Sequence, residues 1–584
     1  MFTTRSYNFV LSTLVLIIAF LIVLSVKPPF SSPDEAHHLM RADGILNGYF
    51  LLKPINEKGT SGAYINSTLA TAEDIYNELS EDSQASSTIA GINKMKNLHW
   101  SPYNIPEAMP NVTFYDPLVY FPQAISFYIG KLFNLSFFYN YIITNTLTFA
   151  CCLLLLLLAY KIYPIPPLAL FFIFIPMSLI QLMSPTIDGL NISMTALIMS
   201  IFVKCLQDSD YKHYISLTFI MSVLIFCTAG SKANLLFFMF LPFWLYLKYR
   251  KKSDFLSFIT VVLLTLGWTV FNIINVNDAA KGRHPGYTNA ELIVFYIEHP
   301  FVMLNIFLNT LKDTELVRFY YHSFIGILGH LDAPIKSWQR NIFVIYFFIF
   351  ISAHLKNKHK LFFSRSTIFI ILIALLSALL IFPALLVQWT KFPTTIVDGI
   401  QGRYFIIPAV VISYAFNLNK KLGKKLYIVI FFTLITSVYS IYDSLKMRYY
   451  DPSISYPANE DLNLVGKAYN LDINSDYTYY INVPEGKIKT IAIFMANYNY
   501  QSKGKAVLKA CNEKDCTTSQ IDISQLDDNS FYSFNLSKSI ISSNNKLNIT
   551  LSFQKENGSL PLALWLYENK KHPGNFSPKT KIYY

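Results

Sequence analysis

A dense group of ionisable side chains follows the first hydrophobic segment of the chain. The stretch FSSPDEAHHLMRADGILNGYF, residues 30–50, contains two adjacent carboxylates, two adjacent histidines and an arginine. At helical spacing, Asp34 shares one face with His37, His38 and Arg41. Because a polar face beside a membrane is costly unless it lines a wet cavity, we expect this face to transfer protons or to bind substrate.

The two carboxylates have different alternatives. Ser32 as N-cap, Pro33 at the first helical position and Glu35 as the partner in a capping box would give Glu35 a structural role. Asp34 is not fully explained in this way, so Asp34 is the first candidate catalytic residue and Glu35 the second. A metal site from these carboxylates and the histidines and a solvated face without a role stay open, although the spacing matches no specific zinc pattern. No metal or other cofactor is indicated.

Four further polar clusters interrupt the hydrophobic sequence. They are SPTIDGLN (184–191), TAGSKAN (228–234), GILGHLDAPI (326–335) and TTIVDGIQGRYF (394–405). The candidate substrate-binding residues in them are Asp188, Lys232, Asp332, Gln401, Arg403 and Tyr404. Arg403 suits a bidentate grip on phosphate, with Lys232 or Arg41 as a second cation. Tyr404 and Trp389 could stack on a sugar or a lipid, or belong to an interfacial aromatic belt.

The composition requires a membrane setting for these clusters. Of the 584 residues 53% are hydrophobic and only 14% are charged, and apolar runs near twenty residues long recur. The net charge of +12 comes from basic residues in short loops, as the positive-inside rule expects, so we do not predict a nucleic-acid partner.

About eleven membrane spans are expected. They lie at about 9–26, 139–160, 165–183, 188–207, 213–229, 234–249, 254–276, 341–357, 366–389, 403–418 and 425–444. If the apolar stretch from Pro117 to Phe133 does not cross, the basic loops at 248–252, 354–360 and 419–425 all face the cytoplasm. The N-terminus is then cytoplasmic, residues 28–116 form the first outer loop, and every polar cluster emerges on the outer face.

The last part of the chain has a different pattern. From about residue 450 short alternating segments such as KTIAIFMANY and LNITLSF replace the long apolar runs. This pattern predicts a helical membrane domain over 1–449 and an all-β sandwich or jelly roll over 450–584, on the outer side of the membrane. Cys511 and Cys516 are expected to form a disulfide in that oxidising compartment.

Five of these segments together resemble the signatures of a known family. SSPDEAHHLMRADGILNGYF, PLVYFPQAISFYIG, PMSLIQLMSPTIDGLNISMTAL, SFIGILGHLDAPI and DGIQGRYFIIPAV look like the successive motifs of bacterial membrane proteins catalogued as a domain of unknown function. The resemblance covers about residues 10–445. That family resembles the GT-C class of membrane glycosyltransferases, which implies a catalytic acid in the first outer loop, here Asp34, and a polyprenyl-phosphate sugar donor. His330 departs from the expected pattern, in which an aromatic residue such as tryptophan stands.

These observations favour a glycosyltransferase of the bacterial inner membrane. Its partners would be a polyprenyl-phosphate-linked sugar, a surface glycan acceptor and the bilayer. A transporter or flippase of lipid-linked saccharides is the alternative, and so is an O-antigen-type polymerase. The sequence shows no internal repeat and its charges lie at the outer rim, which disfavours a transporter.

Overall fold

The structure is a computed structural model of the whole chain. It describes residues 4–55, 61–81, 85–109, 112–275, 287–356, 364–416, 425–450, 454–455, 462–472, 475–482, 486–498, 501–512, 515–524, 526, 528, 530–542, 546–569 and 576–583. The chain forms two compact units, each considered by itself. Unit 1 comprises Met1–Tyr76 and Ile92–Arg448, and unit 2 comprises Asn77–Gly91 and Tyr449–Tyr584.

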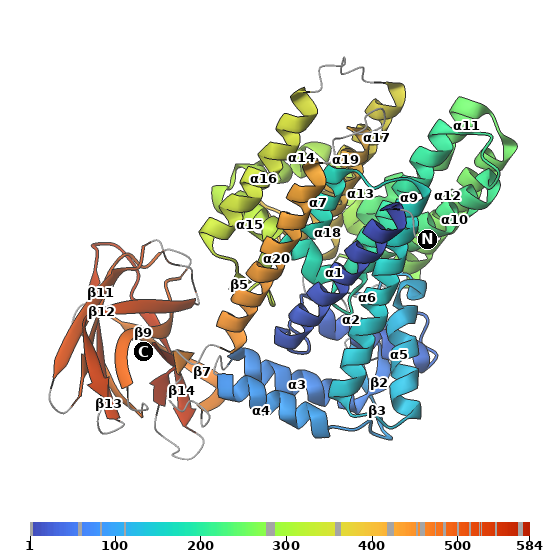
Figure 1. Ribbon diagram of the computed structural model, residues 1–584. Coiled ribbons are helices and arrows are strands. Elements are labelled where there is room, and N and C mark those ends of the chain that lie inside the picture. Colours follow the sequence, from blue (N-terminus) through green and yellow to red (C-terminus); the bar gives the residue numbers. More distant parts are fainter. Residues whose placement is uncertain are drawn as a thin grey trace. The chain divides into compact units, whose positions relative to one another are not determined.

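Unit 1 is mainly helical (Figure 1). Its helices are α1 (Thr4–Val26), α2 (Glu35–Leu46), α5 (Phe121–Leu132), α6 (Phe137–Ile162), α7 (Pro167–Phe174), α8 (Pro176–Leu182), α9 (Ile187–Gln207), α10 (Tyr214–Ser231), α11 (Phe240–Tyr249), α12 (Lys252–Asn275), α13 (Asn289–Glu298), α14 (Pro300–Lys312), α15 (Thr314–Ile325), α16 (Ser337–Lys356), α17 (Arg365–Leu379), α18 (Ile381–Gln388), α19 (Ile406–Ala415) and α20 (Lys425–Tyr449). The described connections between them include the 3-10 helices η2 (Pro117–Tyr120), η3 (Ala233–Met239) and η4 (Gly402–Phe405). Helices α3 (Ser67–Glu81) and α4 (Ala85–Asn97) cross the division between the units.

Fewer helices than predicted are long enough to span a membrane. Within the described residues six helices meet the length and composition of a span, or seven if the bent pair α13 and α14 is one span. The prediction of about eleven is therefore not confirmed, although each of the predicted segments is helical over most of its described length. Several are short or broken; for example, Pro176 ends α7 and begins α8 because proline cannot continue the hydrogen-bond ladder.

Helix α9 is the centre of unit 1. In its apolar window 94% of the residues are buried, and it packs against α6, α10 and α19. A helix that is apolar around its whole circumference belongs in a core, so the other helices surround it. The first turn of α9 carries Asp188, which therefore lies at one end of the core.

Unit 1 also contains short strands. β1 (Lys53–Pro54), β2 (Ser61–Asn66) and β3 (Asn104–Ala108) form an antiparallel sheet in the segment after α2. β4 (Ile327–Leu328) and β5 (Ala333–Pro334) form a hairpin that contains His330 and Asp332.

The strands of unit 2 form two antiparallel sheets. They are β6 (Ile454–Ser455), β7 (Leu462–Leu471), β8 (Tyr477–Asn482), β9 (Gly486–Ala496), β10 (Gly504–Cys511), β11 (Cys516–Asp522), β12 (Ser530–Ser542), β13 (Lys546–Lys555), β14 (Leu562–Asn569), β15 (Phe576–Pro578) and β16 (Thr580–Tyr583). One sheet has the order β11-β10-β13-β8 and the other β15-β14-β9-β16-β6, with β12 beside β9 and β7 beside β14. A single apolar core collects buried residues from both sheets, so the C-terminal β region is a sandwich; the jelly-roll variant stays a prediction.

Two local features of unit 2 bear on the sequence analysis. Cys511 and Cys516 are joined by a disulfide between the paired strands β10 and β11. The unit also includes residues 77–91, where the Thr88 hydroxyl donates to the carbonyl of Tyr449 at 2.6 Å. The sequence analysis assigned that segment to the first outer loop, and the domain boundary at 449 and 450 stays a prediction.

The alternation of buried and exposed side chains along β10 provides a test of the sandwich core. Leu508 is fully buried, whereas its neighbour Lys509 is exposed. In the full-length protein in detergent, Leu508→Ala should lower the free energy of unfolding of unit 2 by about 2–5 kcal/mol, and Lys509→Ala by less than about 0.5 kcal/mol. Urea unfolding followed by circular dichroism measures both; equal midpoints for the two variants would contradict the shared core.

Candidate active site

Four charged side chains from separate segments form one group, the ion-pair cluster of Asp34, Asp188, Lys232 and Arg403. The Arg403 Nη2 atom lies 2.5 Å from Asp34 Oδ2, and its Nη1 atom lies 3.4 Å from Asp188 Oδ2. Lys232 Nζ pairs with Asp188 Oδ1. The structure thus brings together residues from four of the five polar segments that the sequence analysis singled out.

Asp34 is the N-cap residue of α2 and has an unusual backbone. Its φ is 60° and its side chain makes no capping hydrogen bond. The predicted N-cap at Ser32 is wrong, because the Ser32 hydroxyl pairs with that of Ser184 at 2.7 Å and the helix begins at Glu35. A left-handed backbone costs a residue with a side chain about 1–2 kcal/mol, and such conformations gather at functional sites.

Two glycines allow the segments that carry Arg403 and Asp188 to pack closely. A Cβ atom on Gly402 would lie 2.1 Å from the carbonyl oxygen of Tyr320 in α15, so only glycine lets η4 pack there and hold Arg403. A Cβ atom on Gly189 would lie 2.4 Å from the carbonyl oxygen of Gln181 in α8. The tight contact between α8 and α9 in this way determines where Asp188 lies.

The charges of the cluster cancel, and one of its side chains, that of Asp34, is partly exposed to solvent. Two carboxylates meet two cations, and the side chain of Arg403 is 3% exposed whereas that of Asp34 is 36% exposed. Burial is the largest single influence and raises the pKa of Asp34, but the charge of Arg403, the interaction with His38 and the hydrogen bond from Arg403 together leave the pKa below its ordinary value. Asp34 is therefore an ionised carboxylate at neutral pH that a ligand can reach.

Aromatic rings lie against the two cations of the cluster and against His38 in α2. The centroid of the Tyr404 ring lies 5.5 Å from Lys232 Nζ and 5.3 Å from Arg403 Cζ, within the range of cation–π attraction. His38 Nδ1 lies 2.8 Å from the hydroxyl of Tyr120, and its ring stacks on that of Tyr115. Burial lowers the pKa of His38 to about 4, so this histidine is neutral at pH 7.

Glu35 has a different environment from Asp34. It is fully buried and accepts hydrogen bonds from Lys27 Nζ at 3.0 and 3.2 Å and from the backbone N–H groups of Phe30 at 3.2 Å and Ser32 at 2.9 Å. The hydroxyl of Tyr141 is a further donor. Both oxygens thus have partners inside the protein, which gives Glu35 a structural role; its catalytic role stays a prediction. The carboxylate holds the turn that presents Asp34.

Two predicted substrate-binding residues lie outside the cluster. Arg41 is fully buried and its guanidinium donates to the carbonyl oxygens of Tyr49 and Phe50, both at 2.7 Å. Asp332 pairs with Arg448 Nε at 2.7 Å and ties the β4–β5 hairpin to α20. Each charge is used by a contact within the fold, and the substrate-binding roles of both residues stay predictions.

The other predicted residues lie near the cluster. His37 in α2 interacts electrostatically with Asp34 and with His330. The Nε2 atom of His330 lies 2.8 Å from the carbonyl oxygen of Phe30. Gln401 directly precedes η4, and its Oε1 atom is buried without a hydrogen-bond partner among the described residues. No group of three His, Cys, Asp or Glu side chains in the described part of the chain is arranged to hold a metal ion.

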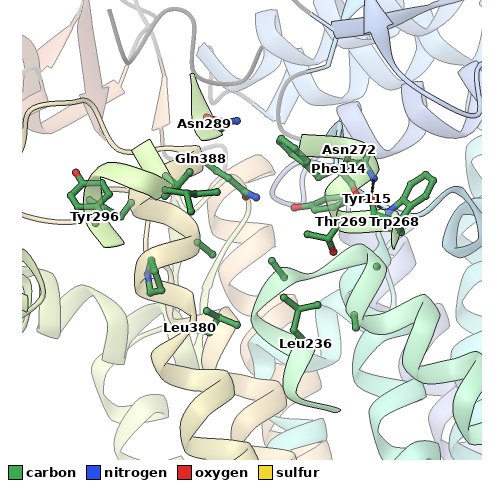
Figure 2. Close-up of a pocket in the computed structure, with 18 of the residues that line it drawn as sticks. Phe114, Tyr115, Leu236, Trp268, Thr269, Asn272, Asn289, Tyr296, Leu380 and Gln388 are labelled. Carbon is green, nitrogen blue, oxygen red and sulfur yellow. Dashed lines mark hydrogen bonds between the residues drawn. The ribbon is translucent and has the colours of Figure 1, made fainter. Parts of the chain in front are cut away.

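Figure 2 shows a cavity of about 450 Å³, one wall of which contains Tyr115. Tyr115 interacts electrostatically with Asp34, Asp188 and Arg403, so the cavity lies near the cluster. Tyr115 lines it and stacks on His38, and Ser231 lines it next to Lys232 in the sequence. Its walls come from η3, α10, α12, α13, α14 and α18 and are mostly apolar, including Leu236, Trp268, Ile293, Met303, Leu380 and Pro383. Tyr115 was not among the predicted site residues, because one tyrosine in a chain with 16% aromatic residues carries no signal.

The buried pair of Lys27 and Glu35 generates a second test. Glu35→Gln leaves the Lys27 ammonium buried without a counter-charge, so the full-length protein in detergent should lose about 3–5 kcal/mol of stability. The double variant Lys27→Met/Glu35→Gln should recover most of the loss because no lone charge remains. Thermal unfolding measures both. The control Lys204→Met breaks a pair whose side chains are 26% and 43% exposed, so it should cost less than about 1 kcal/mol. A wild-type midpoint in Glu35→Gln would exclude the structural role.

Comparisons with known proteins give the chain a family. No curated protein matches the sequence. The structure resembles that of the arabinosyltransferase EmbB from Mycobacterium smegmatis with a TM-score of 0.28 and 10% identity, over 97% of this chain and 66% of that one. The chain therefore spans slightly less than two thirds of that protein, and a similarity at this level carries no argument about activity. The family model described as "Predicted membrane protein (DUF2142)" matches residues 15–412. The chain belongs to this family of predicted membrane proteins.

Proposed function

We propose that this protein is a membrane glycosyltransferase that moves a sugar from a polyprenyl-phosphate donor to a surface glycan. The observation that carries the proposal is the ion-pair cluster beside the apolar cavity. The cluster supplies an accessible carboxylate and two cations, and the cavity supplies apolar walls. A lipid-linked sugar phosphate needs both kinds of surface within a short distance.

The donor would be divided between these two surfaces. A phosphodiester is an acceptor of hydrogen bonds with one negative charge, which suits the guanidinium of Arg403 and the ammonium of Lys232. Ser231 and Ala233, on either side of Lys232, both line the cavity. A phosphate at Lys232 would therefore leave its hydrocarbon chain beside apolar side chains that exclude water.

The chemistry assigns one role to each charged group. Asp34 takes the proton of the acceptor hydroxyl, and the oxygen attacks the anomeric carbon of the donor sugar. The bond from that carbon to the phosphate oxygen breaks, and the electron pair leaves with the polyprenyl phosphate. Lys232 and Arg403 stabilise the charge that grows on this phosphate, while a general base of this type contributes roughly 10²–10⁴-fold.

Donor binding would also prepare Asp34 for proton transfer. Without ligand, Arg403 pairs with Asp34 and helps to keep the pKa of that carboxyl low, which makes it a weak base. A donor phosphate that takes over the guanidinium removes this attraction, so the pKa of Asp34 rises towards the operating pH. The base therefore becomes effective when the donor is present.

The ends of α9 support an outward-facing site in the bacterial inner membrane. Asp188 lies in the first turn, and the last turn, roughly 30 Å away, meets the basic loop 248–252, where Lys248 Nζ donates to the carbonyl of Leu206 at 2.7 Å. Basic loops favour the cytoplasmic side, so the cluster is assigned to the outer side and the N-terminus to the cytoplasm. Residues 357–363 and 417–424, which contain most of the other two basic loops, lie outside the described residues.

The motif resemblance to the GT-C class supports the same reaction. In that class an acidic residue of the first outer loop is catalytic, and Asp34 is the corresponding residue here. The burial of Glu35 leaves Asp34 as the accessible member of the two neighbouring carboxylates.

Substitution of Asp34 tests the reaction. Asp34→Asn keeps the shape of the side chain and removes the base, so sugar transfer should fall by roughly 10²-fold or more at normal membrane abundance. The assay follows labelled sugar from polyprenyl phosphate to surface glycan in membranes. The control Asp208→Asn removes a carboxylate just beyond the other end of α9 and should retain full activity. Full transfer in Asp34→Asn would exclude this mechanism and favour transport of lipid-linked saccharides.

A reporter fusion tests the orientation separately. A reporter that folds only in an oxidising outer compartment, fused after Tyr450, should be active, because the assignment puts the end of α20 outside. The same reporter fused after Lys251 should be inactive, since this residue belongs to the basic loop. A reversed pair of results would move the cluster to the cytoplasmic face.

A further inference from the structure

Two buried amides in the wall of the cavity have no role in the mechanism above. Asn289, the first residue of α13, is 4% exposed, and neither its Nδ2 nor its Oδ1 atom has a hydrogen-bond partner among the described residues. Asn272 in α12 is 1% exposed; its Nδ2 atom donates to the carbonyl of Trp268 at 2.9 Å, and its Oδ1 atom has no partner in the same part of the chain. A buried polar atom without a partner is costly.

Both amides lie among the polar residues of the cavity. Figure 2 shows Asn289 and Gln388 near each other, with Asn272 and Thr269 across the cavity, while Leu236 and Leu380 lie towards the other end. The cavity thus has an end rich in neutral polar groups and an apolar end. A ligand that fills it must combine an apolar part with an uncharged polar part.

The chemistry of an amide defines that polar part. An asparagine side chain offers two donors and one acceptor, and a hydroxyl group likewise both donates and accepts. A phosphate ester offers only acceptors at neutral pH, and a hydrocarbon offers neither. The atoms without partners are one donor group, Asn289 Nδ2, and two acceptors, Asn289 Oδ1 and Asn272 Oδ1, which neighbouring sugar hydroxyls can satisfy together.

We propose that Asn272 and Asn289 bind the hydroxyl groups of a sugar attached to a lipid, whose chain lies against the apolar end of the cavity. The proposal rests on the proposed function, because it extends the same donor site from phosphate to sugar. The two amides then determine which sugar is accepted, while Lys232 and Arg403 bind the phosphate.

Two small probes separate the sugar contacts from the phosphate contacts. Tritiated octyl β-glucoside carries a chain and a sugar without phosphate, and tritiated octyl phosphate carries a chain and a phosphate without sugar. Binding of each to the full-length protein in lipid nanodiscs is measured by scintillation proximity, with empty nanodiscs as background. Asn289→Leu, which keeps the number and branching of the side-chain heavy atoms, should weaken octyl β-glucoside about tenfold and change octyl phosphate less than twofold. Asn272→Leu should act in the same direction.

Control variants make the result specific. Lys232→Met should show the reverse pattern, with weaker octyl phosphate and unchanged octyl β-glucoside. Asn309→Leu changes an exposed asparagine on α14 that does not line the cavity and should affect neither probe. Unchanged octyl β-glucoside binding in Asn289→Leu overturns the proposal, and so does a parallel loss of both probes, because the amide would then support the cavity itself. Neither outcome depends on sugar transfer, so failure here is distinguishable from failure of the catalytic proposal.

Discussion

The burial of Arg403 is the constraint on which the arrangement of unit 1 depends. A guanidinium that is 3% exposed must keep its charge and therefore needs carboxylates beside it, since an unpaired buried ion costs several kcal/mol. Asp34 and Asp188 supply them from the start of α2 and the first turn of α9. The pairing connects segments that are hundreds of residues apart, and the close contacts at Gly189 and Gly402 allow these segments to meet.

Two neighbouring carboxylates illustrate how burial separates structure from chemistry. Asp34 and Glu35 are adjacent in the chain and both meet a cation. The pair of Glu35 with Lys27 has fully buried side chains and its hydrogen bonds are all internal, so it holds the turn. Asp34 pairs with a buried arginine but remains 36% exposed, so a ligand can compete for its partner. Because Asp34 is partly exposed, a bound anion can replace it as the partner of Arg403.

In the proposed function, the cluster, the cavity and the two amides each bind one of the three parts of a lipid-linked sugar. The cations suit a phosphate, the apolar walls suit a hydrocarbon chain, and the neutral amides suit hydroxyl groups. Each surface binds one part of the ligand better than the other two parts, because the cations need a negative charge, the amides need hydrogen-bonding groups and the apolar walls need a hydrocarbon.

The sequence alone determined the class of the protein and the positions where its chemistry is concentrated. Long apolar runs require helices in a bilayer, alternation after residue 450 requires strands, and charges at the ends of apolar runs are too costly to be accidental. These are local properties, so residues such as Asp34, Asp188, Lys232 and Arg403 could be named in advance. Only the tertiary structure decided which of them meet, that Arg41 and Asp332 are used elsewhere, and that Asn289 lines a cavity. Burial and pairing depend on segments distant in the chain, and a one-dimensional pattern carries no distance between them.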